Sequence, residues 1–205
     1  MPPLPLADWK LLCGGSPTMT TGTILSARPF WQTAEQIYGM GEHQITELAQ
    51  LLAEGVPIQE ITDIRGTCYL TSPENTPWGG VQCPDYAQVC RDKKAYAKAT
   101  RQQYEITGKT VLQRHGDKML VQNPPAVSLT QEELDAVYRL PYQRKPHPMY
   151  DAQGGVPGIE EVQFSIAHNR GCFGYCNFCS IALHQGRRIT CRSEESILEE
   201  AKKIT

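Results

Sequence analysis

Three cysteines lie close together in residues 171–180, which read GCFGYCNFCS. Cys172, Cys176 and Cys179 are separated by three and then by two residues. Thiolates are ligands for zinc and for iron–sulfur clusters, and three of them on one short loop can converge on a single centre. The two glycines of the loop let it bend, and their missing side chains leave room for bridging sulfides. The spacing therefore predicts a metal centre.

The kind of centre depends on the fourth ligand. Structural zinc takes four protein ligands, and His168, His184 or Cys191 is near enough in sequence to complete a zinc-binding module. A 4Fe–4S cluster normally takes four thiolates, which would make Cys191 the fourth ligand of an electron-transfer module. A cluster held by three thiolates leaves one iron free to bind a small molecule. The residues alone leave these three arrangements open.

Charge and composition restrict the class of protein. The chain has 205 residues and a net charge of -2, so bulk charge indicates neither nucleic acid nor a membrane surface as a partner. No apolar run approaches the roughly 20 residues that cross a bilayer, and the N-terminus lacks the pattern of a signal peptide. We therefore expect a cytoplasmic protein, in which clustered thiols hold metal more often than they form disulfides.

The other five cysteines have no repeated spacing and are interpreted as small, partly buried apolar residues. They are Cys13, Cys68, Cys83, Cys90 and Cys191.

The segments on both sides of the cysteines should position them. Residues 161–167 read EVQFSIA and predict a strand, so the cysteines would lie on a loop at its carboxyl end, where α/β sheets and barrels bind ligands. After the loop, Ser193 predicts the cap of a helix with Glu194 and Glu195 in its first turn. Four apolar residues would form the inward face of this helix: Ile197, Leu198, Ala201 and Ile204.

The upstream sequence predicts α/β structure. A strand ending at 36–38, a turn at 39–42, a helix over 42–54 and a strand over 61–70 form a strand–turn–helix–strand unit. The glycines of the turn match only part of a dinucleotide-binding fingerprint, so we interpret them as a sharp turn that needs a positive φ.

The middle of the chain predicts three more elements and a linker. A basic helix over 86–104 is explained by a solvated face, and residues around 115–117 predict a β-hairpin. Thr130 and Glu133 form a capping box at the start of a short helix. Prolines and glycines crowd residues 140–158, which predicts a linker between domains.

The Cys-x3-Cys-x2-Cys pattern, with Phe178 before the third cysteine, resembles the radical S-adenosylmethionine (radical SAM) superfamily. The wider stretch FSIAHNRGCFGYCNFCSIALHQGRRITCRSEESILEEAKKI is similar to its YgiQ-like branch. The similarity extends upstream to YGMGEHQITELAQLLAEG, DIRGTCYL and LQRHGDKMLVQNPPAVSLTQEELDAVYRLPYQRKPHPMY, and covers most of the chain from about Trp9 onward.

The resemblance implies that Cys172, Cys176 and Cys179 ligate three irons of a 4Fe–4S cluster, whose fourth iron binds S-adenosyl-L-methionine, and that Phe178 lies near the adenine. It implies an enzyme that cleaves this cofactor reductively to a 5′-deoxyadenosyl radical. An electron donor such as flavodoxin or ferredoxin is the implied partner, and the substrate is not indicated.

The segment HQGRR after the cysteines resembles a family segment. His184, Arg187 and Arg188 would either shape the cofactor or substrate pocket or form an exposed charged loop, and both interpretations are open.

The resemblance also implies the fold class, which is α/β. It consists of the end of a flavodoxin-like, cobalamin-binding-type domain followed by the start of a partial TIM-type (β/α) radical SAM barrel. Residues 1–139 would be the C-terminal part of the N-terminal domain with a connecting region, 140–158 the linker and 159–205 the start of the radical SAM domain. The Asp-x-His-x-x-Gly motif that ligates cobalamin is absent from the sequence, so no cobalamin is assigned. A full barrel takes about 250 residues, so we expect a fragment that is inactive alone.

Overall fold

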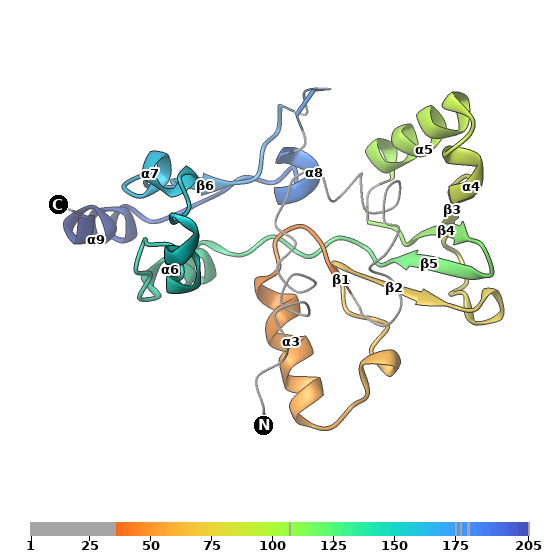
Figure 1. The fold of residues 1–205 in the computed structure, drawn as a ribbon, viewed down its shortest axis with the longest axis horizontal. Helices are drawn as coiled ribbons and strands as arrows, with labels where there is room; N and C mark the ends of the chain where they lie inside the picture. Colours follow the sequence, from red (N-terminus) through yellow and green to blue (C-terminus); the bar gives the residue numbers. More distant parts are fainter. Residues whose placement is uncertain (1–35, 107, 175, 177, 180, 205) are drawn as a thin grey trace. The chain divides into compact units, whose positions relative to one another are not determined.

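The computed structural model describes residues 36–106, 108–174, 176, 178–179 and 181–204 (Figure 1). The chain divides into two compact units. The unit that we call the sheet unit contains the described residues up to Val127 and those of Gly174–Gly186. The helical unit contains Ser128–Phe173 and the described residues from Arg187 onward. Among the described residues, no helix is long and apolar enough to cross a membrane.

The sheet unit is built on a five-stranded sheet with the order β1-β2-β5-β4-β3. All neighbouring strands are antiparallel except β3 and β4, which are parallel. The predicted hairpin is confirmed as β4 and β5, with His115 opposite Lys118. The strands are β1 Gln36–Ile37, β2 Thr67–Thr71, β3 Val81–Gln82, β4 Val111–His115 and β5 Lys118–Gln122.

Helices cover the sheet at two places. Helix α3 lies beside β1 and β2, whereas α4 and α5 lie near β3 and β4 (Figure 1). The helix predicted over 42–54 is confirmed as α3, whose Leu48 is buried against Ile37 of β1. The helices of this unit are α3 Glu42–Ala53, α4 Tyr86–Val89, α5 Lys93–Glu105 and α8 Ile181–Gln185, with short 3-10 turns at Ile58–Glu60 and Pro73–Asn75.

The core of the sheet unit explains two of the scattered cysteines. Cys68 and Cys83 are buried with Tyr38, Val111 and Leu120, so they are small apolar residues as predicted. Burial raises the pKa of the Cys83 thiol and that of the Tyr38 hydroxyl, because an apolar surrounding disfavours their charged forms.

The same prediction is wrong for two other cysteines and untested for one. Cys90 and Cys191 are exposed thiols. Cys90 lies at the C-terminal end of α4, and Cys191 lies in strand β7 of a two-stranded sheet. Cys13 lies outside the described residues.

The single basic helix predicted over 86–104 is in fact two helices. The break falls at Asp92, whose extended backbone lets its side chain accept a hydrogen bond from the Lys94 N–H at 2.8 Å. Aspartate is a favoured N-cap because it satisfies an amide left unpaired at a helix start. The predicted solvated face is confirmed, since Lys93, Lys94 and Lys98 are exposed.

The strand predicted over 61–70 begins only at Thr67, and a turn at 65–66 precedes it. Ile61 and Ile64 are buried in the core as loop residues. Strands β1 and β2 are antiparallel, so the unit β1–α3–β2 is not the parallel crossover that builds a flavodoxin-like sheet. The described strands form a mixed α/β sheet.

An asparagine joins the end of β5 to the loop before β2. Asn123 is buried, and its side-chain amide donates to the carbonyls of Thr62 (2.8 Å) and Ile64 (3.0 Å) and to the hydroxyl of Thr67 (3.1 Å). The backbone carbonyl of Asn123 accepts a hydrogen bond from the Tyr38 hydroxyl at 2.5 Å. One amide therefore holds a loop that has no strand partner.

The helical unit contains six short elements. The predicted capping box is confirmed at the start of α6, where Thr130 and Glu133 bond each other's backbone amides. The predicted cap of α9 is also confirmed, since the Ser193 hydroxyl accepts from the Ser196 N–H at 3.1 Å. The elements are α6 Gln131–Arg139, a 3-10 helix at Pro148–Gln153, α7 Gly158–Val162, β6 Asn169–Arg170, β7 Thr190–Cys191 and α9 Glu194–Ile204.

The strand predicted over 161–167 is wrong. Residues 158–162 form α7 instead, because Pro157 suits a helix start and Glu160 and Glu161 favour its positive N-terminal end. The strand that precedes the cysteines is β6, which is shorter and begins at Asn169.

The predicted inward face of α9 is wrong for Leu198, which is exposed. The fully buried residues of this helix are polar, namely Ser196 and Glu200. They face the buried side chain of Arg192, which hydrogen-bonds to both. A charged partner therefore turns the polar side of the helix inward.

Gly171 lies where β6 leads into the cysteines. Its φ is +87°, and a β-carbon there would overlap the carbonyl oxygen of Arg188 and lie 2.8 Å from that residue's carbonyl carbon. The neighbours are backbone atoms that cannot turn aside, so only glycine fits at this position.

Replacing Asn123 with alanine should lower the free energy of unfolding by about 1–3 kcal/mol, because buried carbonyls would lose their donor. Urea denaturation followed by circular dichroism measures this change. Asn75→Ala is the matched control, because Asn75 is exposed in a 3-10 turn and its loss should cost about 0.5 kcal/mol or less. Equal losses in the two variants would contradict the role of Asn123.

Replacing Gly171 with alanine should lower the free energy of unfolding by roughly 2–5 kcal/mol, from backbone strain and overlap together. Gly154→Ala is the control, because Gly154 has a φ of +88° but open space around its α-carbon. It should lose only the strain, about 1–2 kcal/mol. The same denaturation measurement compares them, and similar losses would show that the overlap at Gly171 does not exist.

Candidate metal centre

None of the three clustered cysteines forms a disulfide, and they lie on both sides of a unit boundary. Cys172 follows β6 by two residues and belongs to the helical unit. Cys176 and Cys179 belong to the sheet unit and precede α8. Cys172 and Cys179 are half-buried, and Cys176 is exposed. Short elements thus hold the chain on each side of the predicted loop.

Cys176 and Cys179 lie on one turn. The Cys179 N–H donates to the Cys176 carbonyl at 3.1 Å, which brings the backbones of these two candidate ligands together just before α8. Among the described residues, no three side chains of His, Cys, Asp and Glu gather closely enough to hold a metal ion.

The donor set is that of a thiolate-held centre. Three cysteines that form no disulfide offer soft sulfur ligands, which favour iron–sulfur clusters or zinc over hard cations such as magnesium. Gly171 and the exposed Gly174 keep side chains away from the backbone next to Cys172. The chemistry of these residues therefore fits an iron–sulfur cluster.

The register of the two-stranded sheet bears on the fourth ligand. Cys191 pairs with Asn169, three residues before Cys172. Cys191 therefore lies in the strand that pairs with the one preceding the cysteines, and it stays a candidate for the fourth ligand. His168, another candidate for zinc, is exposed and lies 3.4 Å from the Asn169 side-chain oxygen through its Nδ1 atom.

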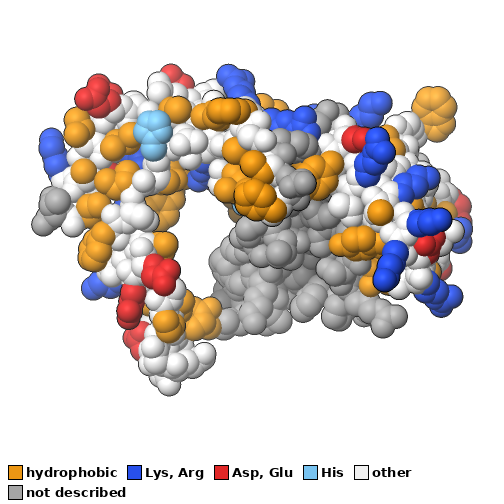
Figure 2. Space-filling view, turned by 90° about the horizontal axis from the view of Figure 1, so that it is seen from above, with side chains coloured by type: hydrophobic (Ala, Val, Ile, Leu, Met, Phe, Trp, Pro, Cys, Tyr) orange, Lys and Arg blue, Asp and Glu red, His pale blue; other side chains and the backbone are white. Residues whose placement is uncertain are grey.

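Aromatic side chains flank the cysteines. Phe178 is 89% exposed to solvent and Phe173 is 82% exposed. Figure 2 shows that apolar side chains also lie among lysines and arginines elsewhere on one face of the molecule. An exposed aromatic ring beside a candidate ligand is available to cover a bound molecule, as the resemblance implied for Phe178.

The segment after the cysteines divides into a packed part and an exposed part. His184 is half-buried in α8, and its carbonyl oxygen would lie 3.0 Å from a β-carbon at Gly39. The sharp turn predicted there is confirmed by a φ of +73° at Gly39. Arg187 and Arg188 are exposed. Arg192, by contrast, is buried. The sequence analysis did not single it out, although its partners Ser196 and Glu200 follow it by four and eight residues.

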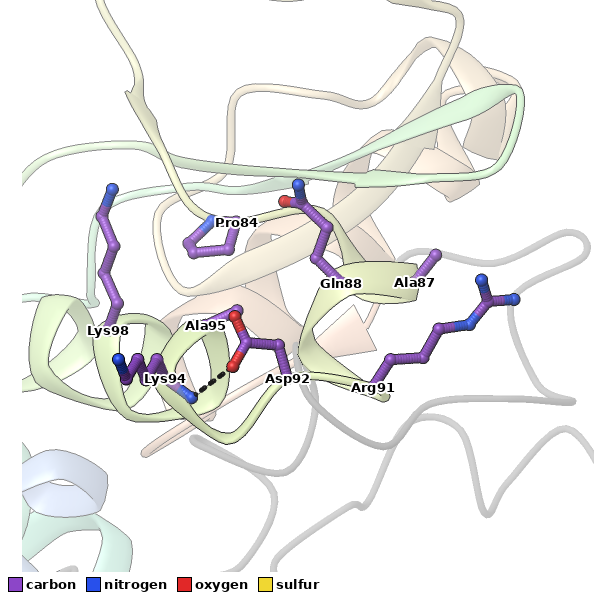
Figure 3. A pocket seen from close by; sticks show the side chains of 8 residues that line it. All are labelled: Pro84, Ala87, Gln88, Arg91, Asp92, Lys94, Ala95 and Lys98. Carbon is purple, nitrogen blue, oxygen red and sulfur yellow. Dashed lines mark hydrogen bonds between the residues drawn. The ribbon is translucent and has the colours of Figure 1, made fainter.

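A separate basic groove lies between α4 and α5, with a volume of about 590 Å³ (Figure 3). Its carboxylate, Asp92, is engaged in capping α5, and none of the clustered cysteines lines it. The lining residues are Pro84, Ala87, Gln88, Arg91, Asp92, Lys94, Ala95 and Lys98.

Two comparisons with known proteins agree. The family model described as Radical SAM N-terminal matches residues 32–165. A UPF0313 protein of Clostridium botulinum (strain ATCC 19397 / Type A) is 47% identical over 173 residues, which are 82% of this chain and 27% of that protein. The UPF0313 protein CPE1196 of Clostridium perfringens (strain 13 / Type A) is 45% identical over 174 residues, which are 82% of this chain and 26% of that protein. No solved structure matches the chain.

The chain thus spans about a quarter of the length of these curated relatives. The matched family region ends at residue 165, before the cysteines, and contains the sheet with most of its helices. It covers more than half of the chain, which confirms the predicted relationship to radical SAM proteins. The chain belongs to the Radical SAM N-terminal family.

Proposed function

We propose that this chain is part of a radical SAM enzyme in which Cys172, Cys176 and Cys179 hold a 4Fe–4S cluster with one open iron. The observation that carries the proposal is a set of three cysteines that form no disulfide, spaced by three and two residues, after β6 in a member of the Radical SAM N-terminal family.

In this proposal, the chain's own residues bind and orient. The three thiolates would hold the irons, and Phe178 would lie near the adenine of S-adenosyl-L-methionine. The cluster, when bound, would supply the electron for reductive cleavage of that cofactor. The electron comes from a donor such as flavodoxin or ferredoxin, and a cytoplasmic location would keep the three thiols reduced. The substrate is left unassigned.

The proposed domain division follows the same assignment. Residues 159–205 form the start of the radical SAM barrel, with β6 before the cysteines and α9 after them. Residues 140–158 connect it to the N-terminal α/β region, 1–139. An ion pair between Arg144 and Glu200 supports a connection that is held against α9 rather than free.

The proposal predicts that anaerobic reconstitution of the full-length protein gives a brown product with about four irons and four sulfides per chain. Changing any of Cys172, Cys176 or Cys179 to serine should remove most of this iron, because three ligands leave no spare thiolate. Metal analysis and absorbance measure the outcome. Adding S-adenosyl-L-methionine should alter the electron paramagnetic resonance spectrum of the reduced cluster.

Cys191→Ser is the matched control, because Cys191 is a free thiol of the same region that the proposal does not use. It should keep the cluster. Loss of the cluster in this variant would support an electron-transfer module with four thiolates instead. A colourless product that contains zinc would contradict the proposal altogether.

A further inference from the structure

A buried arginine lies at the end of β7. Arg192 is 3% exposed, and a buried charge is costly unless it is paired and fully hydrogen-bonded. A guanidinium group has five N–H donors in a fixed planar arrangement. The neighbours of Arg192 should therefore show what holds this charge in place.

All five donors of Arg192 have acceptors. The Nε–H and one Nη2–H donate to the Ser196 hydroxyl at 3.1 and 2.8 Å, and Nη2 also donates to the Ser196 carbonyl at 2.8 Å. Nη1 donates to the carbonyl of Ala167 at 3.1 Å and to the carboxylate of Glu200. The Tyr138 ring of α6 lies 4.0 Å from the guanidinium carbon, a cation–π contact.

A second arginine holds the same stretch of chain. Arg144 donates to the carbonyls of Gln163 at 2.8 Å and Ser165 at 3.2 Å, and it pairs with Glu200. The two arginines together bond the carbonyls of alternate residues, 163, 165 and 167. Guanidinium groups thus occupy acceptors that a neighbouring strand would use in a sheet.

The backbone of Arg192 extends this support toward the first cysteine. Its N–H donates to the His168 carbonyl at 3.0 Å. The next residues form β6, which pairs with β7, and Gly171 then packs against the Arg188 backbone. The chain from Ala167 to Gly171, which leads directly into Cys172, is therefore held at each step by contacts within the helical unit.

We propose that Arg192, with Glu200 and Arg144, is a positioning residue that fixes the strand delivering Cys172 to the metal centre. The inference rests on the proposed function for the presence of a cluster, and on the bonds above for the placement of Cys172. A ligand strand that is held by hydrogen bonds keeps its thiolate in place. Groups that support a metal ligand in this way typically contribute a factor of about 10–100 in metal affinity.

The test uses the full-length protein with Arg192→Lys and Arg192→Met. Lysine keeps the charge but has only three donors at one point, so it cannot reproduce the planar arrangement. Arg139→Met is the matched control, because Arg139 is an exposed arginine at the end of α6 in the same unit. Circular dichroism confirms that each variant is folded.

Two readouts separate positioning from general stability. The first is the alkylation rate of each cysteine in the metal-free protein, measured by mass spectrometry. We expect Cys172 to react several-fold faster in both Arg192 variants, and Cys176, which lies in the sheet unit, to react at the wild-type rate. The second is the rate at which a chelator removes iron from the reconstituted protein, which should rise roughly 10-fold. The control should change neither rate.

The outcomes distinguish the inference from the proposed function. If the wild-type protein binds no cluster, the proposed function is wrong. The alkylation rate of Cys172 then still tests whether Arg192 fixes the position of Cys172. Unchanged alkylation and iron loss in folded Arg192 variants would overturn the inference, even with a cluster present. If Arg192 variants do not fold, Glu200→Gln decides instead, because it removes the ion pairs with both arginines while keeping the side-chain shape. It should raise both rates, and unchanged rates would overturn the inference.

Discussion

The burial of one positive charge is the constraint on which the helical unit depends. A guanidinium group removed from water needs an acceptor for each N–H and a counter-charge, or it destabilises the fold. Arg192 obtains them from the chain before β6 and from α9, and it rests on a ring of α6. Because Ala167 and Tyr138 are distant from Arg192 in sequence, satisfying one side chain also fixes the arrangement of these segments. The polar inward face of α9 follows directly from this requirement.

The sheet unit is stabilised by different means. Apolar clusters fill both sides of its sheet, and burial of apolar surface is their main contribution. Its principal buried polar group is neutral, since the amide of Asn123 organises the loop before β2. The cysteine segment connects the helical unit to the sheet unit along the chain. Its first cysteine follows a strand held by charged hydrogen bonds, and its last precedes a helix that packs against a glycine turn.

Local patterns in the sequence predicted the elements that local interactions determine. The hairpin of β4 and β5, the apolar stripe of α3 and the caps of α6 and α9 each depend on neighbours within a few residues. The prediction of a strand over 161–167 was wrong because the alternation of apolar and polar residues does not determine the local structure there. A proline and two glutamates favour a helix there, and long-range bonds from Arg144 and Arg192 hold the residues that follow. The pattern of apolar and polar residues along the sequence does not show such long-range hydrogen bonds.

In the candidate site, too, some features follow from the local sequence and others depend on long-range contacts. The spacing of Cys172, Cys176 and Cys179 is enough to nominate ligands, because it depends only on the order of residues. The role of Gly171 is visible only when the Arg188 backbone is in place beside it. The antiparallel pairing of β1 with β2 was likewise beyond the pattern, since strand direction in a sheet is set by partners elsewhere in the chain.

The turn at Gly39 limits how this protein could be divided or recombined. Helix α8 follows the cysteines, yet its His184 carbonyl packs against a turn near the start of the described chain, and its Ala182 is buried. A cassette transplanted from residue 159 onward would carry the three candidate cysteines but leave that packing surface behind. Exchange between homologues would therefore have to transfer the glycine turn together with α8, although the two are far apart in the sequence.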